Sequence, residues 1–488
     1  MRRTTVPGSQ ASTFDHKSPY LKAHLRTGYV YVLDSWHLDS AGTGVTGHGS
    51  LLTPDRTVEH DGDFHLPVDS VALFETNLLQ RSGGITALAV MTGVTAAVTA
   101  VCIADPKTCF GSCPTFYVRD SAGPFLHAEG FSSSIAPALE AVDIDALYRA
   151  RPTGRDFHLL LRNEALETHV IRYADLLLLR RPVGGRVVQT AGGQFLQALA
   201  PRPPTRCAAA EGDCRDAVAR FDASERTSLA DSVDLATRES IDLEFDSVGA
   251  GDLGLIVTAR QSLMSTYLLY QTFAYLGSHT SPALAALEGG GPARELVDGV
   301  GRTLGRIEVL VPDATGGWTS VGSVGETGPL AADTKVVRLP RTDAGLVRLR
   351  LRLTRGLWRI DYVALARLGQ PLSALRLAPR RVEREGRPDA AALRSLVDTA
   401  AALVTLPGDA YDLSYWLPPH PEQYELFLQA RGYYLEWMRR EWLAEENPSK
   451  AAEVLLDPAA ALRTLAPAFK RQEPELERRF WNSRYVRH

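Results

Sequence analysis

The sequence has few methionines, few cysteines and no marked excess of charge of either sign. Its 488 residues include four methionines and a single long apolar run, which excludes a protein that crosses a membrane many times. The 53 basic and 57 acidic residues give a formal net charge of -4. A nucleic-acid-binding surface needs a clustered basic excess, so nucleic acid is not an expected partner.

The short motifs of the common enzyme classes are also missing. The chain contains no G-x-S-x-G elbow, no H-E-x-x-H zinc motif, no phosphate loop and no S-x-x-K motif. Its 12 histidines are scattered without metal-ligand spacing. Catalytic groups can assemble from distant positions, so these absences disfavour an enzyme without excluding one. We expect no metal and no cofactor.

Glycine and proline are abundant, at 40 and 29 residues, which favours many short strands joined by turns. A chain of this length exceeds one compact core, so about two to four domains are expected. We predict a mainly β fold with some α (α+β). The expected parts are a small β domain at 18–80, an apolar helix at 84–105, a β-rich domain at 106–290, an antiparallel β-sandwich at 300–380 and a mostly helical C-terminal region at 386–488.

The apolar run Ile85–Ala104 carries no charge and is long enough for a helix to span a bilayer. Its alanines, threonines, valines and glycines are weak membrane formers and would also suit a helix packed inside a protein. Both interpretations stay open. The first twenty residues lack the apolar segment of a secretory signal, so either a removed signal preceded the numbered chain or this run acts as the export anchor.

The five cysteines form two close pairs and a single residue. Cys109 lies near Cys113, Cys207 lies near Cys214, and Cys102 falls inside the apolar run. Close pairs on turn-rich segments favour local disulfides and an oxidising compartment. Free thiols and a four-cysteine zinc site are the alternatives.

Two polar clusters can each be interpreted either as a functional site or as a turn or connection between strands. His60, Asp61, Asp63 and His65 are metal-ligand types, but we favour a polar turn between strands. The segment Asn163–His169 contains two glutamates and a histidine suited to acid–base work. We favour a hairpin connection between strands, with these acids facing water.

Three further patterns carry structural predictions. GAGDLG at Gly249–Gly254 matches a dinucleotide fingerprint, but the following residues read as a strand instead of a helix, so nucleotide binding is not expected. The apolar, aromatic stretch from 263 to 277 predicts a core helix. Arg348, Arg350 and Arg352 alternate along a strand, where a solvated face is favoured over a polyanion site.

The C-terminal part is rich in aromatic residues. They could line a groove for a carbohydrate or a peptide, with Trp416, Tyr433, Tyr434 and Trp437 as the candidate binding residues. Aromatic residues at this density more often attach a terminal segment to a core, and we favour that interpretation. A helix is expected after Asp389, which has the position of an N-cap.

Several segments resemble an uncharacterised bacterial envelope (lipo)protein family. The resemblance rests on CFGSCPTFY at Cys109–Tyr117, on Ala128–Pro137, on Asn163–His169, on Gly356–Leu365 and on Gly432–Arg439. It covers most of the chain and implies an exported, periplasmic or outer-surface protein. The sequence departs from the family by lacking a lipidation cysteine near residue 1. The family carries no assigned activity, so the resemblance assigns no catalytic residue.

These observations favour a non-catalytic exported envelope protein, a scaffold or accessory subunit of a membrane-associated assembly. The expected partners are a membrane or a membrane-protein complex. A carbohydrate- or peptide-binding module and a hydrolase with a dispersed site are the alternatives.

Overall fold

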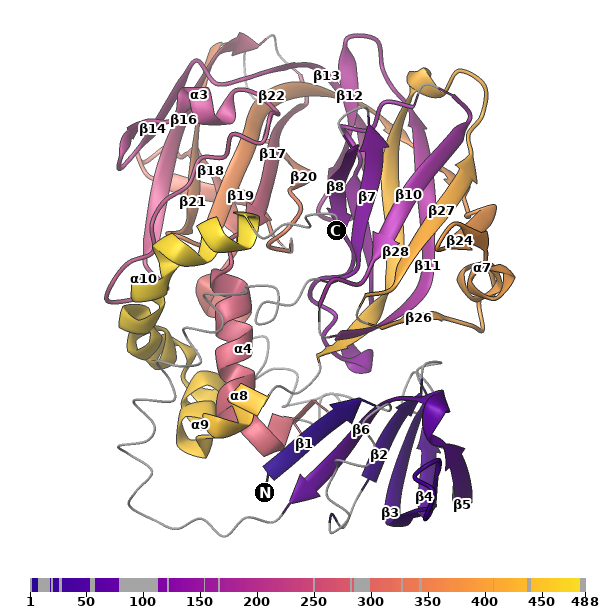
Figure 1. Ribbon diagram of the computed structural model, residues 1–488. Coiled ribbons are helices and arrows are strands. Elements are labelled where there is room, and N and C mark those ends of the chain that lie inside the picture. The colour runs from indigo at the N-terminus through magenta and orange to yellow at the C-terminus, as the bar shows by residue number, and fades with distance from the viewer. Residues whose placement is uncertain are drawn as a thin grey trace.

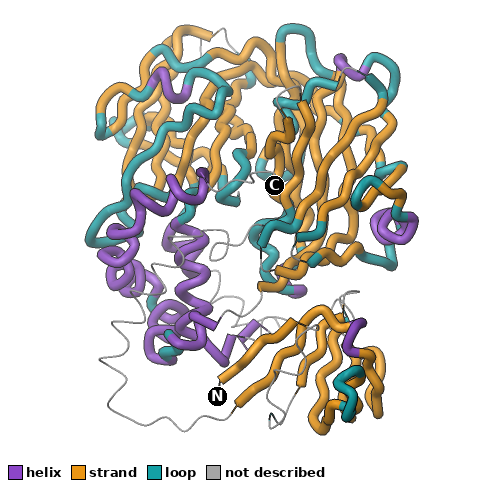
Figure 2. The backbone as a smooth tube through the Cα atoms, in the orientation of Figure 1, coloured by secondary structure: helices purple, strands orange, loops and turns teal. Residues whose placement is uncertain are grey.

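The structure is a computed structural model that describes residues 2–7, 18, 21–25, 29–52, 58–78, 113–120, 123–152, 154–165, 167–248, 251–280, 283–284, 299–325, 328–341, 345–406, 408–436 and 440–482. Strands dominate these residues, and most of the helices form a group beside the sheets (Figure 2), which confirms the mainly β fold with α. The apolar run Ile85–Ala104 lies outside the described residues. None of the helices within them is both long and apolar enough to cross a membrane.

The first sheet has six antiparallel strands and its own small core around Leu21, Leu33 and Phe74. In sheet order the strands are β1 (Arg2–Pro7), β6 (Val71–Leu78), β2 (Leu21–Leu25), β3 (Val30–Leu38), β4 (Gly44–Leu52) and β5 (Val58–Pro67). The turn expected at Asp61–Asp63 is wrong, because these residues lie inside β5 and pair along β4.

Two further sheets face each other as a sandwich (Figure 1). One contains β25 (Arg387–Pro388), β24 (Arg381–Arg384), β27 (Ala410–Trp416), β10 (Asp156–Arg162), β7 (Thr115–Asp120) and β8 (Gly123–Glu129). The other contains β23 (Leu375–Leu377), β11 (Glu167–Arg180), β28 (Tyr424–Glu436) and β9 (Ala141–Ala146), with β26 (Leu403–Thr405) also paired to β11. The buried hydroxyl of Tyr415 donates to the carbonyl oxygen of Ala174 at 2.8 Å and links the two sheets.

The C-terminal region is therefore less helical than expected. β28 runs without a break through Arg431-Gly432, where a hairpin was one interpretation, and it pairs with β11 along almost its full length. Gly432 permits this pairing, because a Cβ there would lie 2.2 Å from the carbonyl oxygen of Val170. Strand pairing of residues 403–436 with residues far earlier in the chain decides their structure.

A fourth sheet closes on itself, and a fifth lies beside it. The closed sheet contains β12 (Gly185–Thr190), β13 (Phe195–Arg202), β22 (Trp358–Leu372), β17 (Leu253–Gln261) and β20 (Asp333–Arg338). Its strands share a buried cluster of Val188, Leu196, Ala198, Ile256, Val336, Ala364 and Ala366. The fifth contains β15 (Gly212–Asp213), β14 (Arg206–Ala209), β16 (Arg238–Val248), β21 (Gly345–Thr354), β18 (Ile307–Pro312) and β19 (Trp318–Val324).

These two sheets mix strands from both sides of the domain boundary expected near residue 300. The run of strands at 300–380 is thus divided between two sheets and does not form a separate sandwich. The reason is that β21 pairs with both β18 and β16, whereas β20 and β22 both pair with β17. Alternation within one segment predicts strands, but not their partners.

The α-helices whose two ends both lie in the described part of the chain are α3 (Arg215–Val218), α4 (Met264–Leu276), α7 (Ala390–Val397), α8 (Arg440–Ala444), α9 (Pro448–Leu456) and α10 (Pro458–Asn482). α4 is the expected core helix, and its Tyr270 and Phe273 pack on Trp442 of α8 at ring distances of 5.0 and 5.6 Å. The expected N-cap is confirmed, because the Asp389 carboxylate accepts two backbone N–H groups of α7.

Candidate functional site

A cavity of about 390 Å³ lies where β8 and the residues after β9 meet the closed sheet. We call it the aromatic pocket. Sites for small molecules usually enclose roughly 300–1,000 Å³ and combine apolar walls with a few placed polar groups. The aromatic and charged side chains that line it include Phe125, Tyr148, Arg149, Phe221, Arg260 and Asp361.

Arg149 is held by two aromatic rings and one carboxylate. Its guanidinium carbon lies 4.8 Å from the ring centre of Phe125 and 4.9 Å from that of Phe221. Its Nη2 lies 3.5 Å from Oδ2 of Asp361, whose side chain is almost fully buried. Burial raises the pKa of Asp361, and the Arg149 charge and two backbone amides oppose that rise. The arginine is therefore fixed in position but keeps a quarter of its side chain exposed to the pocket.

The Phe221 ring is the centre of a wider aromatic and cationic stack. Its other neighbours are Tyr148, with ring centres 5.9 Å apart, and Arg186, whose guanidinium carbon lies 5.7 Å away. The Tyr148 hydroxyl donates to the carbonyl oxygen of Val187 at 2.6 Å. The Tyr148 and Phe221 rings meet edge to face, at an interplanar angle of 79°, so the cluster is held by both ring–ring and cation–ring contacts.

A second arginine closes the pocket. Arg260 donates to both carboxylate oxygens of Glu225 at 2.6 Å and to the carbonyl oxygen of Pro329 at 2.8 Å. The lining thus carries two arginines and two carboxylates, each arginine paired with one carboxylate. Such a site offers both donors and acceptors without a net charge among these four groups.

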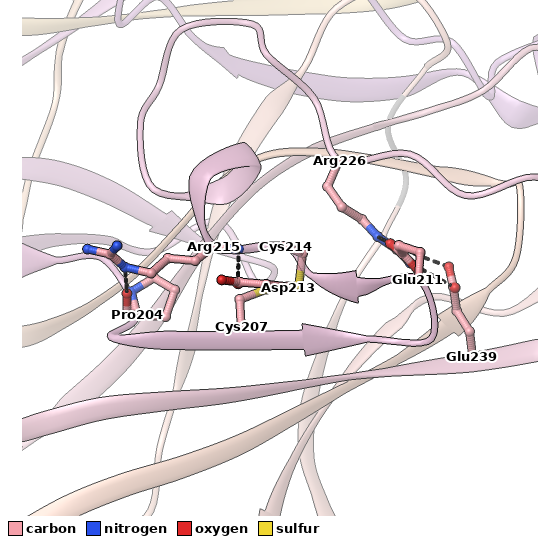
Figure 3. Close-up of a disulfide and its surroundings, with 8 residues drawn as sticks. All are labelled: Pro204, Cys207, Glu211, Asp213, Cys214, Arg215, Arg226 and Glu239. Carbon is pink, nitrogen blue, oxygen red and sulfur yellow. Dashed lines mark hydrogen bonds and ion pairs between the residues drawn. A yellow bond between two sulfur atoms is a disulfide. The ribbon is translucent and has the colours of Figure 1, made fainter.

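The loop that supplies Phe221 and Glu225 is anchored at several points (Figure 3). We call residues 219–226 the clamped loop. The Cys207–Cys214 disulfide, seven residues apart, closes the hairpin before it. At its far end, buried Arg226 donates to both oxygens of Glu211 and of Glu239, at 2.7 and 2.9 Å in each case.

Asp361 holds the middle of the clamped loop. Its Oδ1 accepts the backbone N–H of Asp222 at 3.3 Å and of Ala223 at 2.7 Å. Ala223 has a left-handed φ of 65°, a conformation that needs support from its surroundings. One carboxylate therefore positions both Arg149 and the loop opposite it.

A smaller cavity of about 140 Å³ lies nearby, and we call it the acidic pocket. It brings together side chains from segments that are far apart in the sequence. Cys113, Glu129, Glu167, Tyr270, Tyr434 and Glu436 line it.

Glu129, at the end of β8, lines the acidic pocket and also binds the chain segment that lies between the two pockets. Its Oε2 accepts the backbone N–H of Leu330 at 2.7 Å and of Ala331 at 3.2 Å. We call residues 328–332 the wall segment, because its first two residues line the acidic pocket and its last three line the aromatic pocket. Burial raises the pKa of Glu129 to about 7, and the two amides and the nearby Cys113 thiol oppose the rise.

Cys113 is a free, buried thiol whose Sγ lies 3.7 Å from the carbonyl oxygen of Ser132. The disulfide expected between Cys109 and Cys113 is therefore wrong, and Cys109 itself lies outside the described residues. Burial and the charges of Glu129 and Glu167 raise the pKa of the thiol well above its usual value. A thiol in this state is a poor nucleophile, because the thiolate is the reactive form.

The expected hairpin at Asn163–His169 is also wrong. β10 pairs with β7 and β27, whereas β11 pairs with β28, so the segment crosses between the two sheets of the sandwich. Glu167 and His169 are buried instead of facing water, and His169 Nε2 lies 2.9 Å from Glu167 Oε2.

A second carboxylate near Glu129, that of the half-buried Asp143, is held by backbone groups. Asp143 accepts the backbone N–H of Phe131 and of Ile144, both at 2.9 Å. Burial raises its pKa to about 6, and the charge of Asp333 adds to the rise. Lys335 pairs with Asp333 and donates to the carbonyl oxygen of Ile144.

The four aromatic residues predicted to bind a ligand do not form one exposed face. Tyr433 and Tyr434 are 0% and 3% exposed and belong to the core around β28. Trp416 is 47% exposed at the end of β27, with Arg155 stacked 4.8 Å from its ring centre. Trp437 lies outside the described residues.

The remaining sequence patterns have structural explanations. The strand β17 follows Gly251, as expected, so the glycine motif does not open a helix. The arginine row faces acids on neighbouring strands, with Arg350 2.6 Å from Asp242 and Arg352 2.5 Å from Glu308. No cluster of three potential metal ligands occurs in the described part of the chain.

Sequence reasoning missed Glu129, Arg149, Phe221, Arg260 and Asp361. One signal was available for Asp361, because an acid within the otherwise apolar stretch from Ile360 to Leu365 must be buried with a partner. Phe221 and Glu225 lie in a turn-rich segment where nothing in the local pattern indicates a pocket.

No family model and no curated protein matches the chain. Among solved structures, it is similar to the cycloalternan-forming enzyme from Listeria monocytogenes, with 10% identity over 72% of this chain and a TM-score of 0.17. A GH31 alpha-xylosidase from Xanthomonas citri matches with 10% identity over 88% of this chain and a TM-score of 0.14. The chain spans 29% and 38% of those proteins. At these TM-scores, neither similarity bears on fold or function.

Proposed function

We propose that the protein is a binding protein that holds a short, neutral glycan in the aromatic pocket. The observation that carries this proposal is the combination of aromatic rings with paired charges in one cavity of about 390 Å³. Sugar rings have apolar C–H faces that pack on aromatic rings, and hydroxyl groups that both donate and accept hydrogen bonds. Phe221 supplies an aromatic ring for the C–H faces, and Arg149 and Asp361 supply a donor and an acceptor for the hydroxyl groups.

The charge pairing favours a neutral ligand over an anion. Each arginine of the pocket already contacts a carboxylate, at 3.5 Å for Arg149 and 2.6 Å for Arg260. An anionic ligand would have to compete with Asp361 or Glu225 for its cation. A neutral polyhydroxylated ligand can bridge these groups and leave both pairs intact.

The same pairing favours binding over hydrolysis. A glycosidase uses one carboxylic acid to protonate the leaving group and a second carboxylate as base or nucleophile. In the aromatic pocket, Glu225 accepts hydrogen bonds from Nε and Nη2 of Arg260, and Asp361 accepts two backbone N–H groups. Both carboxylates are therefore used to position other groups. The accessory-subunit role and the envelope location stay predictions from the sequence.

A glycan array tests the proposal. The full chain, labelled at an engineered surface site, is applied to an array of neutral, acidic and amino-sugar oligosaccharides, with neutral peptides on the same surface. We expect retention on a subset of neutral glycans. Retention on peptides alone, or on no ligand, would contradict the proposal.

A further inference from the structure

We propose that the acidic pocket is a second binding site, which takes the protonated end of a primary alkylamine. This inference goes beyond the proposed glycan site and does not rest on it. The site combines three carboxylates, from Glu129, Glu167 and Glu436, in one small cavity. Among the described residues that line it, none is a lysine, arginine or histidine.

The second observation is an unused acceptor inside the cavity. Glu129 is 3% exposed, and its Oε2 is occupied by the amides of the wall segment. Its Oε1 is buried and accepts no N–H or O–H group of the described residues; the Cys113 thiol lies near the carboxylate, but it is a weak donor and also lies 3.7 Å from the carbonyl oxygen of Ser132. A buried acceptor without a donor costs free energy, so it indicates a place where a ligand donor binds.

The remaining lining groups suit an ammonium group and a short carbon stem. An ammonium group has three N–H donors and no acceptor, and the pocket offers carboxylate oxygens together with hydroxyl oxygens from Ser265, Thr266 and Tyr270. Leu269 and Pro329 supply apolar surface for the stem. The volume of about 140 Å³ corresponds to about five water-sized groups, which is enough for the end of an alkylamine and too small for a sugar ring with its substituents.

The geometry of Glu436 supports the same occupant. Its Oε1 accepts the Tyr270 hydroxyl at 2.9 Å, so the carboxylate is held at the pocket from β28 while Tyr270 is fixed on α4. The three carboxylates and Tyr270 therefore come from four different elements, β8, β11, β28 and α4. The occupant is a primary amine of the class found on lysine side chains and diamines.

The test is a titration with propylamine, followed by saturation-transfer NMR of the ligand, with propanol as the neutral probe of the same size. We expect saturable binding of propylamine and none of propanol. Glu129→Gln keeps the acceptor for the wall amides and removes the charge, and it should weaken propylamine binding at least tenfold. Asp143→Asn is the control, since Asp143 is a half-buried carboxylate with two backbone N–H partners that does not line the pocket.

If Glu129→Gln does not fold, Glu436→Gln provides the same test at a half-buried position, with the same expected loss. Equal binding of propylamine and propanol, or equal binding of propylamine to wild type and to the folded Glu129→Gln or Glu436→Gln variant, would overturn the proposal. Loss of binding in Asp143→Asn to the same extent would also overturn it, because the effect would then not be local to the pocket.

Discussion

The carboxylate of Glu129 accepts the backbone N–H of Leu330 at 2.7 Å, across 201 residues of sequence. This contact fixes the wall segment, which separates the acidic pocket from the aromatic pocket. Gly328 begins the segment, and a Cβ at that position would lie 2.2 Å from the Glu129 carboxyl carbon. The absence of a side chain at residue 328 is therefore a condition for the contact.

Gly328→Ala should destabilise the fold. The added methyl overlaps a buried carboxylate, so the wall segment or Glu129 must move, and overpacking of this kind costs about 1–3 kcal/mol. Urea unfolding measures the change. Gly301→Ala is the matched control, because Gly301 is helical and exposed with nothing within 4 Å of the added carbon. An unchanged unfolding midpoint in Gly328→Ala would show that the wall segment is not held as described.

Glu129 should also make stability depend on pH. Its pKa is raised to about 7 in the folded chain, whereas an unfolded glutamate titrates near 4.3. Between these values the folded state retains a proton that the unfolded state has released, so stability falls as the pH rises from about 4.3 to about 7. The shift corresponds to roughly 4 kcal/mol.

Unfolding of wild type and Glu129→Gln at several pH values between 4 and 8 measures this contribution. The stability difference between the two chains should move in favour of the variant as the pH rises, and should level off above about pH 7. Asp143→Asn should show a smaller change that levels off near pH 6, since burial raises the pKa of Asp143 to about 6. A difference between wild type and Glu129→Gln that stays constant with pH would contradict the raised pKa.

A buried and an exposed arginine–carboxylate pair should contribute very differently to the stability of the fold. Arg226 is 3% exposed and bridges two carboxylates, one of them the buried Glu239, whereas Arg350 pairs with Asp242 at the surface. Arg226→Ala leaves a buried carboxylate without its partner and should cost about 3–5 kcal/mol. Arg350→Ala should cost less than about 1 kcal/mol. Equal losses, measured by chemical unfolding, would mean that the clamp does not hold the loop.

The disulfide should affect ligand binding as well as stability. It closes the hairpin whose turn carries Glu211, and Glu211 binds the arginine at the end of the clamped loop. Replacing Cys207 and Cys214 by alanine should cost about 2–4 kcal/mol of stability and weaken glycan binding several-fold, because Phe221 loses its anchor. Cys113→Ala, which breaks no disulfide, should leave glycan affinity unchanged. A double variant that binds glycan as tightly as wild type would show that the disulfide does not influence the aromatic pocket.

Local features of the fold follow from the sequence, and the sites do not. The Asp389 cap, the core helix α4 and the short disulfide loop depend on neighbouring residues, so their patterns predict them. The burial of Glu167 depends on β28, more than 250 residues later, and a local pattern cannot contain that partner. The aromatic pocket likewise joins Phe125 to Asp361 through strand pairings that alternation leaves open.

Calorimetric titration of Phe221→Ala and Trp416→Ala with the glycan retained on the array is the most direct test. Both substitutions remove a partly exposed aromatic ring stacked on an arginine, but only Phe221 lines the aromatic pocket. We predict that Phe221→Ala lowers the affinity at least tenfold, which corresponds to about 1.4 kcal/mol, while Trp416→Ala binds as wild type does. The reverse result, with binding lost in Trp416→Ala and kept in Phe221→Ala, would place the glycan at the exposed tryptophan and contradict the proposed site.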